Sequence, residues 1–450
     1  MSSGEGGPTI GLRTLVLYGL PGLPLAAVTL PLYIHIPNFY AVDLGLGLGL
    51  VGLVVLAMRL WDVVTDPLVG ILSDRIGGRY GRRRLWVAIG LPVAVIGGWM
   101  LFRPPSDAGL LHLLFAGMVL HLGWTLVMLP YQAWGAELTG DYNQRNRITA
   151  WREGFVVIGT LVAGGLVAAA GSPETRAEAL ATVGLVLAIG LPLAVGPALL
   201  LLPDPIIVRS GGPTGRSEWR DGLRRMAGNK PFIRLLFAWI LNGIANGLPA
   251  TLFLLYVGAI LGQPEQSGLF LSTYFLVAIA GLPLWLWLAG KIGKHRTWCV
   301  AMIWACGWFA LAPFLGQGDS VAYMALCIGT GLALGADLAL PPSMQADVVD
   351  VDTAQQGGPA RTGVYFALWG MATKLALALA VGIAFPLLDA AGLDTDASAI
   401  PEGDGTLVLA LLYGAVPIAF KLAAIALMWR FPLNAETQDA LRVRIEGSDE

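Results

Sequence analysis

Charged side chains interrupt an apolar stretch of the chain in a regular pattern. Residues 59–67 read RLWDVVTDP, and on a helix positions 59, 62 and 66 lie on one face. Asp62 and Asp66 are then one turn apart, about 5–6 Å between Cβ atoms, and their carboxylates repel each other. A bound cation, a shared proton or nearby basic groups relieve this repulsion. The spacing therefore predicts a site for a monovalent cation or a proton.

Other side chains of suitable chemistry can complete this site. Arg59 supplies one positive charge, and Lys374 supplies a second if its helix faces the first across a cavity. Oxygen ligands suit a hard cation such as Na⁺, and Thr65 and Thr125 add hydroxyl groups. If a proton replaces the ion, one carboxylate becomes neutral. The competing interpretation is a buried ion-pair cluster that only fixes the helix register.

The composition defines the environment of these charges. Of 450 residues, 56 % are hydrophobic and 13 % are charged, about half the charged share of a soluble domain. So few charges cannot coat an ordinary water-facing surface, and the chain is predicted to be an integral membrane protein. A charge at bilayer depth costs at least about 2.5–3.5 kcal/mol on insertion scales. Each intramembrane charge should therefore have a partner or a function.

Several classes of function are not expected. The net charge is −2 and basic residues are not interleaved with exposed aromatic ones, so no nucleic-acid partner is predicted. The three cysteines lie in apolar stretches, which predicts neither disulfides nor a metal site. No Walker loop or nucleophile–base pair can be read, so we expect neither ATP-driven transport nor an enzyme. The polar start is not typical of a signal peptide, and we expect no cofactor beyond a coupling ion.

The elements that must position the charges are membrane-spanning helices. A span needs about 20 mostly apolar residues, and the sequence contains twelve such stretches: 11–37, 44–72, 85–103, 109–137, 151–171, 177–202, 231–260, 266–290, 297–314, 320–345, 363–391 and 405–430. Prolines in the first stretch predict a broken or kinked helix. Residues 203–230 form the longest polar interruption, within which 218–226 could form a short amphipathic helix on the membrane surface.

This organisation predicts an all-α polytopic membrane protein. The predicted parts are an N-terminal six-helix bundle (1–202), a cytoplasmic central loop (203–230), a C-terminal six-helix bundle (231–430) and a cytoplasmic tail (431–450). The same basic turn follows the second span of each half, at 70–86 and 290–298. Six-plus-six repeats indicate the major facilitator architecture, with the ligand site between the halves.

Lysine and arginine are distributed unevenly between the loops. With both termini inside, the inner loops and inner span ends hold 23 of the 28. Positive charge favours the cytoplasmic side, so we expect a multi-pass inner (plasma) membrane protein with both termini cytoplasmic. Among the three basic residues inside spans, Lys421 is expected to snorkel toward the surface.

The segment around the two aspartates is similar to the cation-site helix of the glycoside–pentoside–hexuronide:cation symporters, the melibiose permease group. The resemblance covers essentially the whole chain, and further motifs in family order carry it: PYQAWGAEL from Pro130, NGIANGLP from Asn242, MQADVVD from Met344 and RTGVYF from Arg361. It implies alternating-access symport of a solute with Na⁺, Li⁺ or H⁺.

Residue by residue, the resemblance assigns roles to several positions. Asp62 and Asp66 match the two cation-site aspartates of the family, and Lys374 matches the lysine that approaches them. Thr65 matches the position where a polar side chain affects cation choice, and Thr125 matches a cation-site threonine. Where sugar-transporting members carry sugar-binding aspartates, this chain has Ala26 and Met128, whereas Arg152 matches the sugar-site arginine. The cation half of the mechanism is therefore expected, and galactoside recognition is not.

The remaining polar residues inside the spans are candidates for contact with substrate. Asn242 and Asn246 either bind substrate or join helices by hydrogen bonds, and His121 is also consistent with plain helix packing. Asp337 lies deeper in its span than the acidic residues at the inner span ends, and it is a stronger candidate than they are. The full set of candidates is His35, His121, Trp124, Gln132, Trp134, Arg152, Asn242, Asn246, Tyr274 and Asp337.

Charges near the inner ends of the spans could form a gate. Opposite charges at corresponding places in the two halves could pair when the cavity opens outward; ordinary solvation of charged span ends is the alternative. The gate candidates are Glu137, Glu153, Asp347, Asp350 and Arg361, with Arg152 as a further basic member.

The sequence thus predicts a monomeric secondary symporter that moves a small organic solute, sugar-like or glycoside-like, with Na⁺ or H⁺. Its expected partners are the solute, the monovalent cation and the bilayer. One alternative is a cation-coupled transporter of a lysolipid or another amphipathic substrate, which a leucine-rich first span would suit. Another is a non-transporting membrane assembly factor, although a scaffold has no need of the costly cluster at Asp62 and Asp66.

Overall fold

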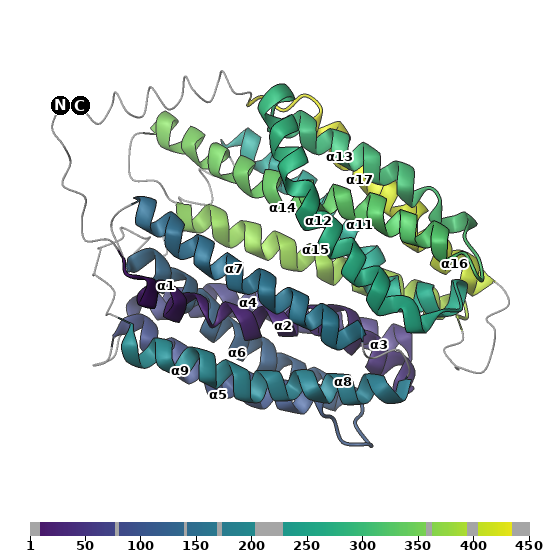
Figure 1. Ribbon diagram of the computed structural model, residues 1–450, viewed down its shortest axis with the longest axis horizontal. Helices are drawn as coiled ribbons and strands as arrows, with labels where there is room; N and C mark the ends of the chain where they lie inside the picture. The colour runs from purple at the N-terminus through teal and green to yellow at the C-terminus, as the bar shows by residue number, and fades with distance from the viewer. Residues whose placement is uncertain are drawn as a thin grey trace. The chain divides into compact units, whose positions relative to one another are not determined.

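The computed structural model describes residues 10–76, 81–138, 142–168, 173–202, 228–356, 362–393 and 404–433. The chain divides into two compact units, Met1–Arg209 and Ser210–Glu450. In the described residues the regular structure is entirely helical. Figure 1 shows the helices of the N-terminal unit in purple to teal and those of the C-terminal unit in green to yellow.

Helices of very different length make up the N-terminal unit. They are α1 (Leu12–Gly19), α2 (Gly22–Leu30), α3 (Ile36–Asn38), α4 (Leu48–Arg75), α5 (Arg82–Phe102), α6 (Leu110–Glu137), α7 (Tyr142–Ala168), α8 (Pro173–Leu185) and α9 (Leu191–Leu201). Three π-helical turns join some of these pieces into longer spans: η1 (Pro31–His35), η2 (Phe39–Asp43) and η3 (Val186–Gly190).

The first span is broken where the sequence predicted it. Helix α1 ends just before Pro21, which is the N-cap of α2, and α2 ends just before Pro31. The span then continues through η1, α3 and η2 to Asp43. Proline has no backbone N–H and its ring clashes with the preceding turn, so the α-helical hydrogen-bond ladder is interrupted at these positions. The predicted broken helix is confirmed.

Helices α5 and α6 approach each other to backbone contact. A Cβ on Gly97 would lie 2.3 Å from the Leu120 nitrogen, and a Cβ on Gly123 would lie 2.2 Å from the Ala94 nitrogen. Only glycine allows this separation, as in other membrane helix pairs built on small residues. The close packing fixes the rotation of α6 about its axis, and with it the direction in which His121 and Thr125 point.

A reciprocal tyrosine pair joins α1 to α6. The Tyr18 hydroxyl donates to the Tyr131 carbonyl at 3.1 Å, and the Tyr131 hydroxyl donates back to the Tyr18 carbonyl. The rings stack with centroids 4.7 Å apart. A Cβ at Gly135 would lie 2.0 Å from the Tyr18 hydroxyl. The tyrosine and the glycine of the 130–138 motif therefore have a packing function in this unit.

The C-terminal unit contains another set of long helices. They are α11 (Lys230–Leu255), α12 (Ser267–Ile292), α13 (Lys294–Phe309), α14 (Ser320–Gln356), α15 (Thr362–Ala390), α16 (Asp404–Tyr413) and α17 (Ala415–Met428), with the short turns η4 (Tyr256–Ile260), η5 (Pro264–Gln266) and η6 (Ala312–Phe314). Buried aromatic side chains fill its core. Trp239 of α11 stacks on Trp369 of α15 at 4.8 Å, and the Tyr323 and Tyr413 hydroxyls hydrogen-bond at 2.6 Å.

The described helices agree with the predicted spans. Eleven of them are long and apolar enough to cross a membrane. The remaining predicted stretch, 151–171, falls mostly in α7, whose 27 residues extend about 40 Å. The all-α, twelve-span prediction is therefore confirmed in fold class. The predicted surface helix at 218–226 and the tail beyond residue 433 lie outside the described residues.

We predict that Gly123→Ala destabilises the N-terminal unit. The added methyl would overlap the α5 backbone at Ala94, and overpacking of this kind costs about 1–3 kcal/mol. Thermal unfolding of the detergent-purified variant should show a lower midpoint than wild type. Gly154→Ala in α7 is the matched control, because its added Cβ meets nothing within 4 Å. Equal midpoints for the two variants would contradict the close packing of α5 and α6.

Candidate functional site

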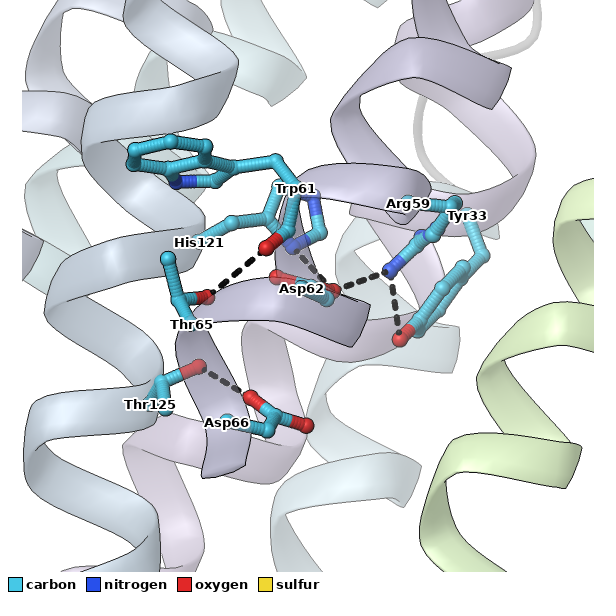
Figure 2. A network of polar contacts seen from close by, with 8 residues as sticks. All are labelled: Tyr33, Arg59, Trp61, Asp62, Thr65, Asp66, His121 and Thr125. Carbon is cyan, nitrogen blue, oxygen red and sulfur yellow. Dashed lines mark hydrogen bonds and ion pairs between the residues drawn. The ribbon is translucent and has the colours of Figure 1, made fainter. Parts of the chain in front are cut away.

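The charged residues predicted from the sequence come together on α4 in the N-terminal unit. Asp62 is 0 % exposed, Arg59 4 % and Thr65 5 %, while Asp66 is partly exposed. Figure 2 shows the cluster, with α6 supplying the residues opposite α4. A carboxylate with no access to solvent at membrane depth needs compensation from its neighbours. The contacts around Asp62 provide it.

Asp62 lies between two nitrogen-bearing side chains. The His121 Nδ1 is 3.0 Å from its Oδ2, and the Arg59 Nη1 is 3.6 Å from the same atom. Arg59 is held in place by Tyr33: Nη1 donates to the tyrosine hydroxyl at 3.1 Å, and the guanidinium carbon lies 4.1 Å from the ring centroid. The first span, α4 and α6 therefore all contribute to the environment of one carboxylate.

Asp66 has a different environment one turn further along α4. The Thr125 hydroxyl donates to its Oδ1 at 2.8 Å. The Thr65 hydroxyl donates to the Trp61 carbonyl at 3.0 Å, which leaves the oxygen lone pairs of Thr65 for a ligand. Unlike Asp62, Asp66 is partly exposed. The two carboxylates therefore differ in access, and Asp66 is the more accessible one.

Two helices present matched pairs of side chains. On α4, Asp62 and Asp66 are four residues apart, and on α6, His121 and Thr125 have the same spacing. Because four residues make about one helical turn, His121 faces Asp62 and Thr125 faces Asp66 (Figure 2). Gly123, between them in sequence, points toward α5. This spacing is a sequence signal that could have linked His121 to the aspartates.

His121 was predicted from the sequence among the substrate candidates, and the structure places it against Asp62. An imidazole can donate a hydrogen bond when neutral and adds a positive charge when protonated. Together with the hydroxyls of Thr65 and Thr125, the cluster contains the carboxylate and hydroxyl oxygens that a small hard cation prefers. The same arrangement can hold a proton on a carboxylate or on the imidazole.

The other substrate candidates of the N-terminal unit are scattered. His35 lies in η1 and is 3 % exposed. Trp124, Gln132 and Trp134 lie on α6, and Trp134 is 1 % exposed. Arg152 lies on α7 and pairs with its neighbour Glu153, 2.5 Å from Nη2 to Oε1. None of these contacts joins the candidates to the aspartate cluster in the described residues.

A second buried polar network occupies the C-terminal unit. The Lys421 ammonium of α17 donates to the Asn242 Oδ1 and to the Asn246 Oδ1, both at 2.8 Å. The Asn246 amide donates in turn to Asp337 Oδ2 at 2.8 Å, and the Trp298 indole donates to Asp337 Oδ1 at 2.5 Å. A lysine and an aspartate are thus connected through one amide group. Helices α11, α13, α14 and α17 meet at this network.

The expectation that Lys421 snorkels was wrong. Its side chain is 2 % exposed, because the amide oxygens of α11 and the nearby carboxylate make the interior favourable for an ammonium group. Asn242 and Asn246 join helices here, which is one of the two alternatives left open by the sequence. Tyr274, on α12, belongs to the same unit.

The gate candidates are only partly described. Asp347 of α14 is 6 % exposed and pairs with Lys294 of α13, 2.6 Å from Nζ to Oδ2, within the C-terminal unit. Glu137 and Asp350 lie on α6 and α14, but their side chains are outside the described residues, as is Arg361. Pairing between the halves, and the approach of Lys374 on α15 to the aspartates, involve both units and stay predictions.

Comparisons with known proteins show which family and which individual proteins this chain is similar to. The profile of the family described as MFS/sugar transport protein matches residues 17–435. The sodium-dependent lysophosphatidylcholine symporter 1-A of Danio rerio is 25 % identical over 85 % of this chain and 78 % of its own. The human sodium-dependent lysophosphatidylcholine symporter 1 is 25 % identical over 84 % of this chain and 75 % of its own.

A solved structure extends the likeness to the fold. The crystal structure of the nucleoside transporter NupG superposes with a TM-score of 0.66 at 14 % identity, over 93 % of this chain and 99 % of that one. At this identity the likeness concerns the fold alone. It agrees with the long helices seen in both units.

We predict that Lys421→Met destabilises the C-terminal unit more than a double substitution does. The single change removes the ammonium that lies one amide group away from the buried Asp337 carboxylate, and the loss should be smaller than the about 3–5 kcal/mol of a broken direct ion pair. Lys421→Met combined with Asp337→Asn removes both charges and should recover part of the unfolding midpoint. Thermal unfolding of wild type, both single variants and the double variant measures the coupling. Strictly additive midpoint losses would show that the two charges do not interact.

Proposed function

The chain belongs to the MFS/sugar transport protein family, and from this premise we propose that it is a cation-coupled symporter whose substrate is a lysophospholipid or a similar amphipathic molecule. Membership makes it a multi-pass membrane transporter of the major facilitator superfamily. The coupling ion, the substrate and the residues that bind them are the proposed part. The observation that carries the coupling is the pair of carboxylates in a membrane-spanning helix, with Asp62 buried and Asp66 partly exposed.

The different surroundings of the two aspartates suggest their roles. Asp62 is fully buried between His121 and Arg59, so its charge is compensated by the protein. Asp66, partly exposed beside the Thr125 and Thr65 hydroxyls, would bind the ion directly. The resemblance of residues 59–67 to the cation-site helix of the glycoside–pentoside–hexuronide:cation symporters supports the same assignment. Sodium is the first choice of ion, because both relatives are named sodium-dependent.

Cation binding would set which conformation of the carrier is populated. A ligand shifts a conformational equilibrium only by its differential affinity for the two states. We propose that the ion, held at Asp66, stabilises the state that binds substrate, and that the empty carrier returns after the ion is released. The proposed cytoplasmic placement of both termini rests on the strong asymmetry of lysine and arginine between the loops.

The choice of substrate rests on what the candidate sugar positions contain. Ala26, 7 % exposed, and Met128 occupy the positions where the resemblance would require sugar-binding carboxylates. Apolar side chains at those positions favour an acyl chain over hydroxyl groups, because a sugar site needs polar groups that pair with each hydroxyl. The names of the relatives point in the same direction.

A sugar or glycoside is the second candidate substrate. Two observations favour it: the printed description of the family and Arg152, which matches the sugar-site arginine. In the structure that guanidinium pairs with Glu153. A sugar would therefore have to replace this partner, whereas a lysolipid phosphate could bind the arginine by charge alone.

We predict that Na⁺ stabilises the wild-type protein in a saturable way. A ligand that binds the folded state alone raises stability by RT ln(1 + [L]/Kd). Thermal unfolding in NaCl against choline chloride at matched ionic strength should give a higher midpoint in Na⁺, and Asp66→Asn should abolish the difference. Asp107→Asn, which removes an exposed loop carboxylate, is the control and should keep it. A sodium shift that survives in Asp66→Asn would refute the assigned site.

A competition experiment separates the two substrate classes. Reconstituted protein should take up labelled lysophosphatidylcholine under an inward Na⁺ gradient, and an excess of mono- or disaccharides should leave uptake unchanged. The expected result follows from the apolar residues at positions 26 and 128. Asp62→Asn should reduce uptake to background while the protein remains folded. Inhibition by sugars but not by other lysolipids would instead establish the second candidate.

A further inference from the structure

A groove lies on the surface of the C-terminal unit between α11 and α17. Its volume is about 500 Å³, and it is lined by Lys230, Ile233, Arg234, Phe237, Ile240, Leu241 and Leu427. Five of the seven lining residues are apolar and the two basic ones lie together at one end, so the groove has a charged end and an apolar body.

The groove follows α11 in the direction of its axis. Lys230, Arg234, Phe237 and Leu241 are spaced i, i+4, i+7 and i+11, which places them along one face of the helix. From residue 230 to residue 241 the helix rises about 16 Å, roughly half of the ~30 Å hydrocarbon core of a bilayer. The groove, with its charged end included, is therefore about as long as one leaflet, and its apolar part from Ile233 to Leu241 is about 12 Å long.

The charged end of the groove coincides with the start of a membrane span. Helix α11 begins at Lys230, where the Asn229 side chain caps it by accepting from the Phe232 backbone N–H at 3.1 Å. The candidate span also begins at Lys230, so the two basic residues lie where the lipid headgroups are and the apolar ones lie beside the acyl chains. The first N–H groups of a helix add further positive potential at this end.

One of the basic residues is fixed in position. The Arg234 Nη1 donates to the Arg430 carbonyl at 2.9 Å, and its Nε donates to the Leu427 carbonyl. These bonds use two of the five guanidinium donors and tie α11 to the C-terminal end of α17. Lys230 is exposed. A phosphate at this end would meet one preorganised cation and one adaptable cation.

The apolar body is open to the outside. Phe237 is 57 % exposed, whereas Ile233, Leu241 and Leu427 are partly buried against the hydrophobic core of the unit. A rigid apolar wall with an exposed aromatic ring at membrane depth can hold one acyl chain in van der Waals contact. Basic pockets between membrane helices are known sites for anionic headgroups.

We propose that this groove binds an anionic phospholipid of the bilayer, with its phosphate at Lys230 and Arg234 and one acyl chain along Phe237 and Leu241. The charge complementarity of the basic end selects an anionic headgroup over a zwitterionic one, and the groove as a whole is about as long as one leaflet. The site is separate from the aspartate cluster of the N-terminal unit, and it does not depend on the transported substrate.

Lipid binding to the purified full-length protein tests the proposal. The probes are phosphatidylglycerol and phosphatidylcholine with identical acyl chains, and glycerol 3-phosphate as a soluble anion. Each probe is titrated into the protein, and the lipid that stays bound is counted by native mass spectrometry. Phosphatidylglycerol should bind more tightly than phosphatidylcholine. Lys230→Gln should weaken phosphatidylglycerol binding about fivefold, the factor for one basic residue near a membrane surface, and should leave phosphatidylcholine binding unchanged.

Two further variants keep the result interpretable. Lys291→Gln removes another membrane-edge lysine, whose ammonium lies over the Trp287 ring at 3.9 Å and outside the groove, and it should bind phosphatidylglycerol as wild type does. Phe237→Ala should weaken long-chain phosphatidylglycerol more than a short-chain analogue. The proposal would be overturned by equal affinity for the two headgroups, or by equal losses of binding in Lys230→Gln and Lys291→Gln. It would also be overturned if glycerol 3-phosphate, which has no acyl chain, displaced phosphatidylglycerol by itself.

Discussion

A carboxylate placed in a low-dielectric interior needs a partner, and the arrangement of the N-terminal unit follows from this requirement. Asp62 is 0 % exposed, and an uncompensated charge at that depth would cost several kcal/mol. His121 and Arg59 meet the requirement at 3.0 and 3.6 Å, and Tyr33 in turn holds Arg59. Three membrane segments must stay in register for these contacts to exist. The charge therefore specifies how the helices pack as well as what the site can bind.

Glycine packing fixes the position of α6, on which the contacts to the buried Asp62 depend. Because Gly97 and Gly123 allow the α5 and α6 backbones to touch, α6 cannot rotate without a clash, and His121 and Thr125 keep facing α4. A mobile α6 would leave Asp62 without its imidazole for part of the time. Close contact with α5 on one face of α6 and the contacts to Asp62 and Asp66 on the other are thus two parts of one arrangement.

The charged side chains inside the two units have different surroundings. In the N-terminal unit the carboxylates differ in access, since Asp62 is buried and Asp66 is partly exposed. In the C-terminal unit Lys421 and Asp337 are linked through the Asn246 amide and are both largely buried, an arrangement closed to solvent that favours a fixed junction of helices. This contrast is why we assign ion coupling to the first unit and a packing role to the second network.

The sequence by itself determined the membrane class, the spans and the aspartate face of α4, because hydropathy and helical periodicity are local properties of the chain. The broken first span was equally readable, since proline acts on its own helix. Contacts between distant segments were decided by the tertiary structure alone. His121 lies 59 positions from Asp62 and Lys421 lies 179 from Asn242. The shared four-residue spacing on α4 and α6 is compatible with the first contact, but no local pattern reports which helices lie side by side. Lys421 near a span end looks from the sequence like a snorkelling residue, and only the packed amides of α11 make burial the favourable outcome.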